Sequence, residues 1–105
     1  MMARFMFAYH GGGRPETPEE GEKMMAAWHK WIEDLGPTMV EPGNPVGQSY
    51  TVSAGETVDN GGANPIMGYS VVETDSIESA LDIAKGSPHL MMNGATIEVA
   101  QLFEM

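Results

Sequence analysis

Residues 87–105, SPHLMMNGATIEVAQLFEM, run from the end of a predicted helix into the longest strand-like segment of the chain. Pro88 restricts the backbone where the chain leaves the helix, and Gly94 releases it into a strand over residues 95–103. We expect this strand to complete a sheet and the Pro88-His89 turn to form one wall of a pocket. Alternation predicts two faces: Ile97, Val99 and Phe103 on one, and Thr96, Glu98, Ala100 and Leu102 on the other.

A helix and, before it, a strand are predicted directly upstream. The helix begins at Asp75 or Ser76, where Asp75 and Glu78 have capping-box spacing, and Gly86 ends it. The strand covers residues 66–73. The predicted buried stripe of the helix is Ile77, Ala80, Leu81 and Ala84. The strand alternates with Met67, Tyr69 and Val71 opposite Ser70 and Val72.

The N-terminal part has the same order, a strand followed by a helix. Residues 4–9 carry apolar side chains on both faces, which indicates an interior strand. Thr17 can cap the following helix, Pro18 suits its first position, and Glu20 completes a capping box. Gly36 then ends the helix. The strand places Phe5, Phe7 and Tyr9 opposite Met6 and Ala8, and the buried stripe of the helix is Met24, Ala27, Trp28, Trp31, Ile32 and Leu35.

The middle of the chain is richer in turn residues. Residues 38–41 form a short strand candidate, and residues 48–54 form a longer one. Residues 55–65, rich in glycine and asparagine, are too polar for the core and predict a loop. We therefore expect strands 48–54 and 66–73 to lie on either side of this loop.

These elements predict an α+β fold in the order β-α-β-β-α-β, which is the ferredoxin-like arrangement. We expect residues 1–105 to form a single domain, with both helices on one face of an antiparallel sheet. Met6, Ala8, Val72 and their neighbours would then lie on the other face, in contact with water. Because an apolar sheet face needs a cover, we expect a homodimer packed sheet to sheet.

Composition excludes several classes of function. The net charge is −10, with 15 acidic residues against 5 Lys and Arg, which opposes binding to nucleic acid or to an anionic membrane. The absence of cysteine excludes disulfides, thiol nucleophiles and thiolate metal ligands. No apolar run predicts a signal peptide or a membrane span. We expect a cytoplasmic protein.

The candidate catalytic residues are the three histidines, His10, His29 and His89, because only these side chains ordinarily titrate near neutral pH. Asp34 or Glu98 could supply a carboxylate partner for general acid–base chemistry. A second interpretation of His89 is that its imidazole satisfies backbone groups of the turn. The histidine spacing includes no HxH or HxxxH pair, so we expect no metal site.

Glycines 11–13 and the methionine pairs are two further features that could form a binding site. The glycine run lacks the spacing of a phosphate-binding loop, and the glutamates that follow would repel phosphate, so we expect no bound cofactor. The chain has ten methionines, and Met24-Met25 and Met91-Met92 are the pairs suited to an adaptable apolar pocket or interface. Filling of irregular gaps in the core is the alternative role for these side chains.

Several stretches of the chain resemble the YCII-related family. They are RFMFAYHGGG (residues 4–13), the TPEE helix start (17–20), MAAWHKWIEDLG (25–36), PGNPVGQSYTVS (42–53) and residues 68–105, which begin GYSVVETDS. The resemblance covers nearly the whole chain and implies a dimeric α+β barrel of ferredoxin-like subunits, in agreement with the exposed sheet face.

The same family suggests enzymatic function through a His–Asp pair beside a cleft between sheet and helix. In this chain His10 stands in the place of the acid, Met25 stands in the place of the histidine, and His29 follows one turn later. Residues 59–62, DNGG, stand where a related branch has a D-G-P-F motif. The pair is therefore not carried over to this chain.

Three functions are consistent with these observations. The first is an enzyme that uses a histidine as acid–base group on a small molecule in a cleft between sheet and helix. The second is a non-catalytic module that binds a small ligand or regulates, as a homodimer. The third is a protein–protein interaction module in which the barrel itself is the functional part. Because folds of this kind host unrelated functions, the three functions can be distinguished only by the residues and geometry of the site.

Overall fold

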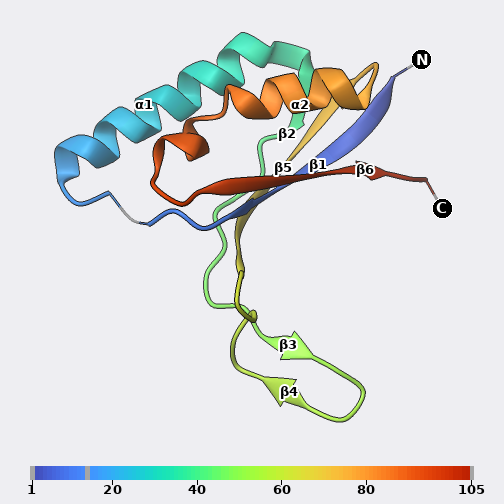
Figure 1. Ribbon diagram of the computed structural model, residues 1–105. Helices are drawn as coiled ribbons and strands as arrows, with labels where there is room; N and C mark the ends of the chain where they lie inside the picture. The colour runs from blue at the N-terminus through green and yellow to red at the C-terminus, as the bar shows by residue number, and fades with distance from the viewer. Residues whose placement is uncertain (1, 14, 105) are drawn as a thin grey trace.

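Two helices cover one face of a four-stranded antiparallel sheet in the computed structural model, which describes residues 2–13 and 15–104 (Figure 1). The sheet has the order β2-β5-β1-β6, which is the strand order of the ferredoxin-like fold. The predicted α+β class is thus confirmed. The strands of the sheet are β1 (Ala3–His10), β2 (Met39–Glu41), β5 (Ile66–Thr74) and β6 (Thr96–Leu102). The helices are α1 (Pro18–Leu35) and α2 (Ile77–Lys85), with 3₁₀ turns η1 (Gly36–Thr38) and η2 (Pro88–Met91).

The second strand of the sheet is β2, and the prediction that residues 48–54 would take this place is wrong. Of that segment only β3 (Thr51–Val52) is a strand, and it pairs with β4 (Thr57–Val58) in a separate hairpin, inside the stretch predicted to be loop. The chain leaves the sheet at Pro45, which makes one isolated bridge to Gly68. Proline has no N–H to donate to a strand ladder, and one further bond to β5 follows it, from the Val46 N–H to the Met67 carbonyl oxygen.

The core lies between the helices and the sheet face that carries Phe5, Phe7 and Tyr9. Pairing of β1 with β5 sets Phe5 opposite Val72 and Phe7 opposite Ser70, and all four side chains are buried. Val72 therefore faces the helices, and its predicted position beside Met6 and Ala8 is wrong. The other face, called the open face below, carries these side chains of β1, β5 and β6: Met6, Ala8, Tyr69, Val71, Ala100 and Leu102.

Helix α1 begins and packs largely as predicted. The Thr17 side chain accepts a hydrogen bond from the Glu20 N–H at 3.1 Å. The Glu20 carboxylate, however, accepts from the Glu16 N–H at 3.0 Å, so the reciprocal bond of the capping box is displaced by one residue. The predicted stripe is half-buried. Within it Trp28 packs edge-on against Tyr9, with ring centroids 5.3 Å apart, and both tryptophans border the core.

Helix α2 starts at one of the two predicted positions, but it lacks the predicted Asp75–Glu78 capping box and buries a narrower face. Ser76 is the N-cap, and its side chain accepts from the Ser79 N–H. Asp75 accepts instead from the Ser79 hydroxyl at 2.8 Å, and this bond lowers the pKa of the Asp75 carboxyl. The buried residues of α2 are Ala80 and Ala84.

Two sets of large apolar side chains are more exposed than predicted. Ile77 and Leu81 are each 41% exposed, because α2 turns its alanines to the sheet and packs with Ile83 half-buried. Alanine has no side chain beyond Cβ, so this rotation lets the helix backbone approach β1 and β5 closely. Phe103 lies beyond the end of β6 and is exposed, so it does not share the buried face of Ile97 and Val99.

The observed faces predict which of two substitutions, one at buried Val72 and one at exposed Ile77, lowers the free energy of unfolding more. Val72→Ala removes a fully buried side chain and should lower the free energy of unfolding by about 2–3 kcal/mol. Ile77→Ala removes more atoms from a half-exposed site on a helix and should cost under about 1 kcal/mol. Urea denaturation of both variants measures the difference, and an equal cost at the two sites would contradict the assignment of Val72 to the helix-facing side.

Candidate functional site

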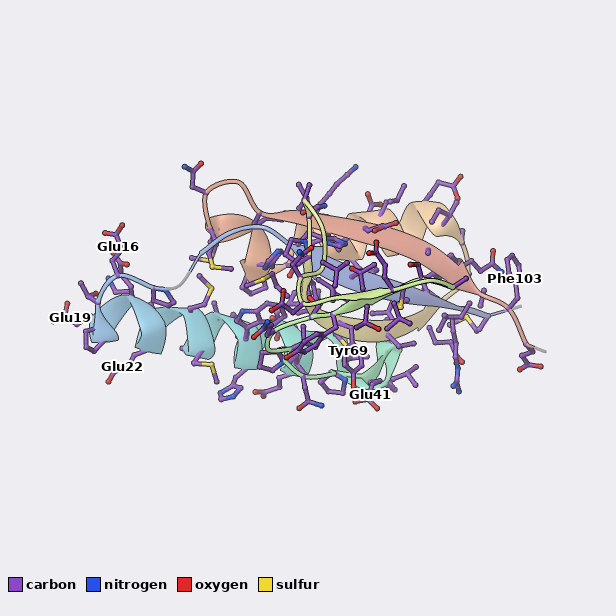
Figure 2. All side chains as sticks on the ribbon, turned by 90° about the horizontal axis from the view of Figure 1, so that it is seen from below. Glu16, Glu19, Glu22, Glu41, Tyr69 and Phe103 are labelled. Carbon is purple, nitrogen blue, oxygen red and sulfur yellow. The ribbon has the colours of Figure 1, made fainter. Side chains whose placement is uncertain are left out.

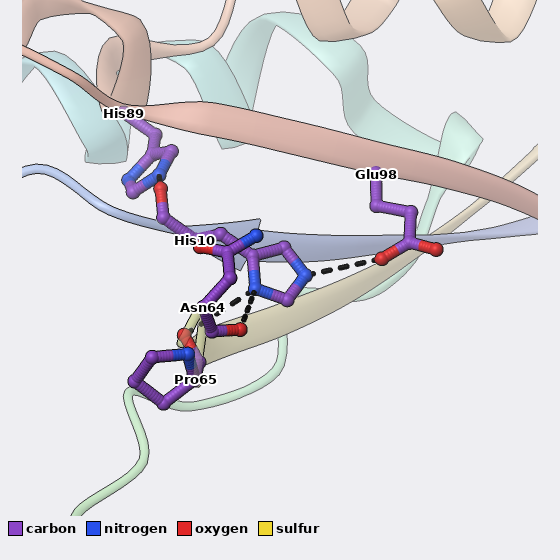
Figure 3. A network of polar contacts seen from close by, with 5 residues as sticks. All are labelled: His10, Asn64, Pro65, His89 and Glu98. Carbon is purple, nitrogen blue, oxygen red and sulfur yellow. Dashed lines mark hydrogen bonds and ion pairs between the residues drawn. The ribbon is translucent and has the colours of Figure 1, made fainter. Parts of the chain in front are cut away.

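His10 ends β1, and its ring lies on the open face among three oxygen acceptors (Figure 3). Its Nε2 is 3.1 Å from a Glu98 carboxylate oxygen of β6. Its Nδ1 is 3.0 Å from the Asn64 carbonyl oxygen and 3.3 Å from that of Pro65. Because all these partners are acceptors, both ring nitrogens donate at once only in the doubly protonated imidazolium form. Through these contacts the His10 ring joins β1, β6 and the segment before β5.

The His89 ring contacts the backbone of His10 and not the His10 ring. The His89 Nε2–H donates to the His10 carbonyl oxygen at 2.8 Å, and the residue is buried. Its ring centroid lies 5.0 Å from that of Tyr9. The His89 imidazole thus satisfies a backbone carbonyl at the end of β1 and fastens η2 to the sheet, while its other nitrogen remains outside the His10–Glu98 pair.

The remaining two candidates, His29 and Asp34, lie on α1, with their side chains exposed. Asp34 forms an ion pair with Lys30, one helical turn earlier, at 3.2 Å. Both residues belong to the helix layer, whereas the His10 ring lies across the sheet from it. The structure therefore brings His10, His89 and Glu98 together and leaves His29 and Asp34 apart from them.

A buried hydrogen-bond chain beside His89 begins at the Tyr9 hydroxyl. Tyr9 donates to the Ser70 hydroxyl at 2.8 Å, and Ser70 donates to the Pro42 carbonyl oxygen, also at 2.8 Å. Burial raises the pKa of Tyr9 to about 12, against the opposing effect of hydrogen bonds with Ser70 and Ser87. The sequence predicted only the strand face that Tyr9 shares with Phe5 and Phe7, and the pairing of β1 with β5 adds this chain of bonds.

Two grooves flank η2 on the helix side of the molecule, and Met91 borders both. One groove, of about 480 Å³, lies between α1 and the end of α2, with Trp31 and Pro88 in its lining. The other, of about 560 Å³, is called the methionine groove below. Its apolar lining includes Met24, Met91 and Met92 beside the Gly12 loop, and its polar lining is Glu16, Glu20, Lys23 and Asn93. His10, His29 and His89 are in neither lining.

The methionine groove depends on the glycine run that sequence patterns did not explain. Gly12 has a φ of +74°, and a Cβ there would lie 2.9 Å from the Met92 methyl carbon. Glycine therefore lets Met92 lie directly on the loop and form a groove wall. Of the methionines singled out in the sequence, Met24, Met91 and Met92 line the groove, while Met25 is exposed on α1.

Residues 2–13 and 15–104 contain neither a metal-binding cluster nor a helix that could span a membrane. No group of three or more His, Asp or Glu side chains in this part of the chain could hold a metal ion. Within the same residues, neither helix combines the length and the apolar character that crossing a membrane requires. The grooves and the His10 cluster are therefore the features from which a function can be argued.

Comparison with known proteins gives a structural neighbour and no family match. No family model matches it, and no curated protein matches it. Among solved structures, the hydroxynitrile lyase from Passiflora edulis aligns over 99% of this chain and 95% of that one, with 10% sequence identity and a TM-score of 0.48. Membership of the YCII-related family remains a prediction.

The raised pKa of Tyr9 predicts a loss of stability in alkaline solution. The unfolded chain ionises this phenol near 10.0 and the folded chain near 12, so the unfolded state binds fewer protons between these values. The free energy of unfolding should therefore fall by about 2 kcal/mol from pH 10 to pH 12 on account of Tyr9. Urea denaturation across this range should show a shallower fall in Tyr9→Phe, and equal slopes for the two proteins would contradict it.

Proposed function

We propose that this protein is a homodimer of the YCII-related type that binds a small apolar molecule in the methionine groove, without catalysis by its histidines. The observation that carries the proposal is the lining of that groove by three methionines from α1 and the η2 region. The proposal also assigns residues 1–105 to one domain and the protein to the cytoplasm, where its lack of cysteine is permissive.

Methionine suits the proposed role because it is unbranched, flexible and polarizable, so it can repack around ligands of different shape. Met91 is exposed and borders both grooves, which leaves it free to move toward a ligand. Glu16, Glu20, Lys23 and Asn93 form the polar part of the lining, which a ligand with one polar end would meet. The expected ligand class is therefore a small molecule with an apolar body.

The histidines favour binding over acid–base catalysis. Both nitrogens of His10 face acceptors already supplied by the chain, and the Nε2 of His89 is used by the His10 carbonyl. A general base needs a free nitrogen within reach of the proton it removes. His10 would have to give up a bond that joins segments of the fold before it could act. His89 has its Nε2 in use and is buried, so its ring is largely closed to a substrate.

The homodimer is proposed from the open face. Its centre is apolar across β1, β5 and β6, with Met6, Tyr69 and Val71 only half-buried in the single chain. Both helices lie on the opposite side of the sheet, so they leave this face uncovered (Figure 1). A second copy, related by a two-fold axis, would cover each open face with the other and form a dimeric α+β barrel.

An acid–base enzyme is the second candidate, favoured by the His10–Glu98 pair. A histidine beside a carboxylate at 3.1 Å, with 12% of the histidine side chain exposed, is a combination found at catalytic sites. Conversion of the bound compound by the wild type, lost in His10→Gln, would establish this function in place of the first. Ligand binding that is unchanged in His10→Gln, with the compound recovered intact, would favour the binding module.

Binding in the methionine groove can be measured with the neutral fluorescent probe N-phenyl-1-naphthylamine. Met91→Glu replaces an apolar wall of the groove with a third carboxylate beside Glu16 and Glu20 and should weaken probe binding about tenfold or more, because the new charge would lose water when the probe binds. Met25→Glu is the matched control, since Met25 is also exposed but lies outside the groove, and its affinity should equal that of the wild type. Equal affinities of all three proteins would overturn the site.

Dimerisation can be measured by sedimentation velocity, where the wild type should have twice the monomer mass of 11.3 kDa. Met6→Glu puts one carboxylate from each subunit into the packed open faces and should weaken the dimer about 100-fold or more. Met25→Glu, on the helix side, should leave the dimer unchanged. A wild type that sediments as a monomer at micromolar concentration would refute the proposed homodimer.

A further inference from the structure

Residues 47–64, called the arm below, project from the sheet on its open side. Figure 1 shows the β3–β4 hairpin on the side opposite the helices, and the view from below in Figure 2 shows it in front of the sheet. The two largest apolar side chains of β3 and its approach are Tyr50, 61% exposed, and Val52, 73% exposed. The arm therefore carries uncovered apolar surface on the same side as the open face.

The root of the arm is fastened to the sheet at both ends. On the entering side the Val46 N–H donates to the Met67 carbonyl oxygen at 3.1 Å, next to the bridge of Pro45 with Gly68. On the returning side the His10 ring binds the Asn64 carbonyl oxygen at 3.0 Å. These contacts set the direction in which the arm leaves the sheet, so it is not a free linker.

The arm also holds its own shape through polar contacts. Thr51 donates from its hydroxyl to the Asn60 carbonyl oxygen at 2.7 Å, and the Gln48 amide donates to the Asp59 carbonyl oxygen at 3.0 Å. Two strands of two residues each enclose no core, and an isolated two-stranded hairpin is marginally stable in water. The hairpin has a defined shape and a defined direction, but its apolar side chains are exposed in the single chain. This indicates that a surface outside this subunit packs against it.

The area of the open face points to the identity of that surface. The four strands have 8, 3, 9 and 7 residues. At about 4.8 Å between strands and about 3.4 Å per residue they give a footprint of roughly 450 Å². A stable dimer buries about 800 Å² on each partner. The sheet faces alone fall short of this area, and the arm is the part of the chain that extends beyond the sheet on the correct side to supply the difference.

We propose that the arm is a clasp for the second copy of the chain, with Tyr50 and Val52 packed against the partner subunit beside the open sheet face. The inference rests on the proposed homodimer and adds a second contact region to it. Under two-fold symmetry each subunit contributes one arm, so both clasps form together. Tyrosine is among the residues that most often anchor interfaces, because it buries a large rigid area.

Sedimentation equilibrium of Tyr50→Ala and Val52→Lys tests the clasp. Each variant should weaken the dimer about tenfold or more, because each changes two symmetric contacts. Ile77→Lys is the matched control: Ile77 is also an exposed apolar residue, but it lies on α2, and its dissociation constant should stay within about twofold of the wild type. Far-UV circular dichroism confirms that each variant is folded.

Limited proteolysis gives a second measurement that does not depend on any substitution. The arm of the wild type should be cut slowly above the dissociation constant of the dimer and quickly below it, because the partner covers the arm only in the dimer. Arm cleavage that does not change with protein concentration, in a protein shown to dimerise, would overturn the clasp.

The outcomes separate the clasp from the homodimer on which it rests. If the wild type is a monomer, both ideas fail. If the wild type is a dimer that Met6→Glu dissociates while Tyr50→Ala and Val52→Lys leave its dissociation constant unchanged, the homodimer stands and the clasp is wrong.

Discussion

The pairing of β1 with strands on both of its sides is the constraint on which the structure depends. β5 and β6 both pair antiparallel with β1, so its backbone groups are satisfied by segments more than 50 residues away in the chain. One face of β1 carries the three buried aromatic residues of the core, and the other carries the small and flexible side chains of the open face. A shift of β1 by one residue against either neighbour would exchange the two faces and expose the aromatic core.

The end of β1 connects the other functional features. The His10 ring holds the root of the arm and Glu98, and the His10 carbonyl holds His89 and therefore η2, which borders both grooves. A single residue thus lies between the proposed dimer clasp on one side of the sheet and the proposed ligand groove on the other. This position explains why histidine occurs here without implying catalysis, since the hydrogen-bonding capacity of both its nitrogens and its carbonyl is used in holding segments together.

Much of the fold could be predicted from the chain, but the candidate site could be predicted only in part. The methionine pairs pointed to an adaptable pocket, and Met24, Met91 and Met92 do line a groove, but nothing local distinguished them from Met25. The three histidines were singled out by residue type alone, and residue type gave no indication that the ring of His89 would bond to the backbone carbonyl of His10. The role of Gly12 depends on Met92, a residue 80 positions away, and so it has no local signature.

The sequence by itself determined the elements that local physics encodes: the Thr17 cap and the start at Pro18, the end of α1 at Gly36, and the alternation of β1 and β5. Period and capping depend on neighbours a few residues apart, so a single segment contains the whole signal. The tertiary structure decided which strand joins the sheet, which face Val72 occupies, and how far α2 rotates to place Ala80 and Ala84 on the sheet. These features depend on which distant segments pair and pack together. The alternation of a strand has a period of two whichever strand it pairs with, so it does not predict the pairing. Residues 48–54 show the difference, because they alternate like a sheet strand and yet pair only within the arm.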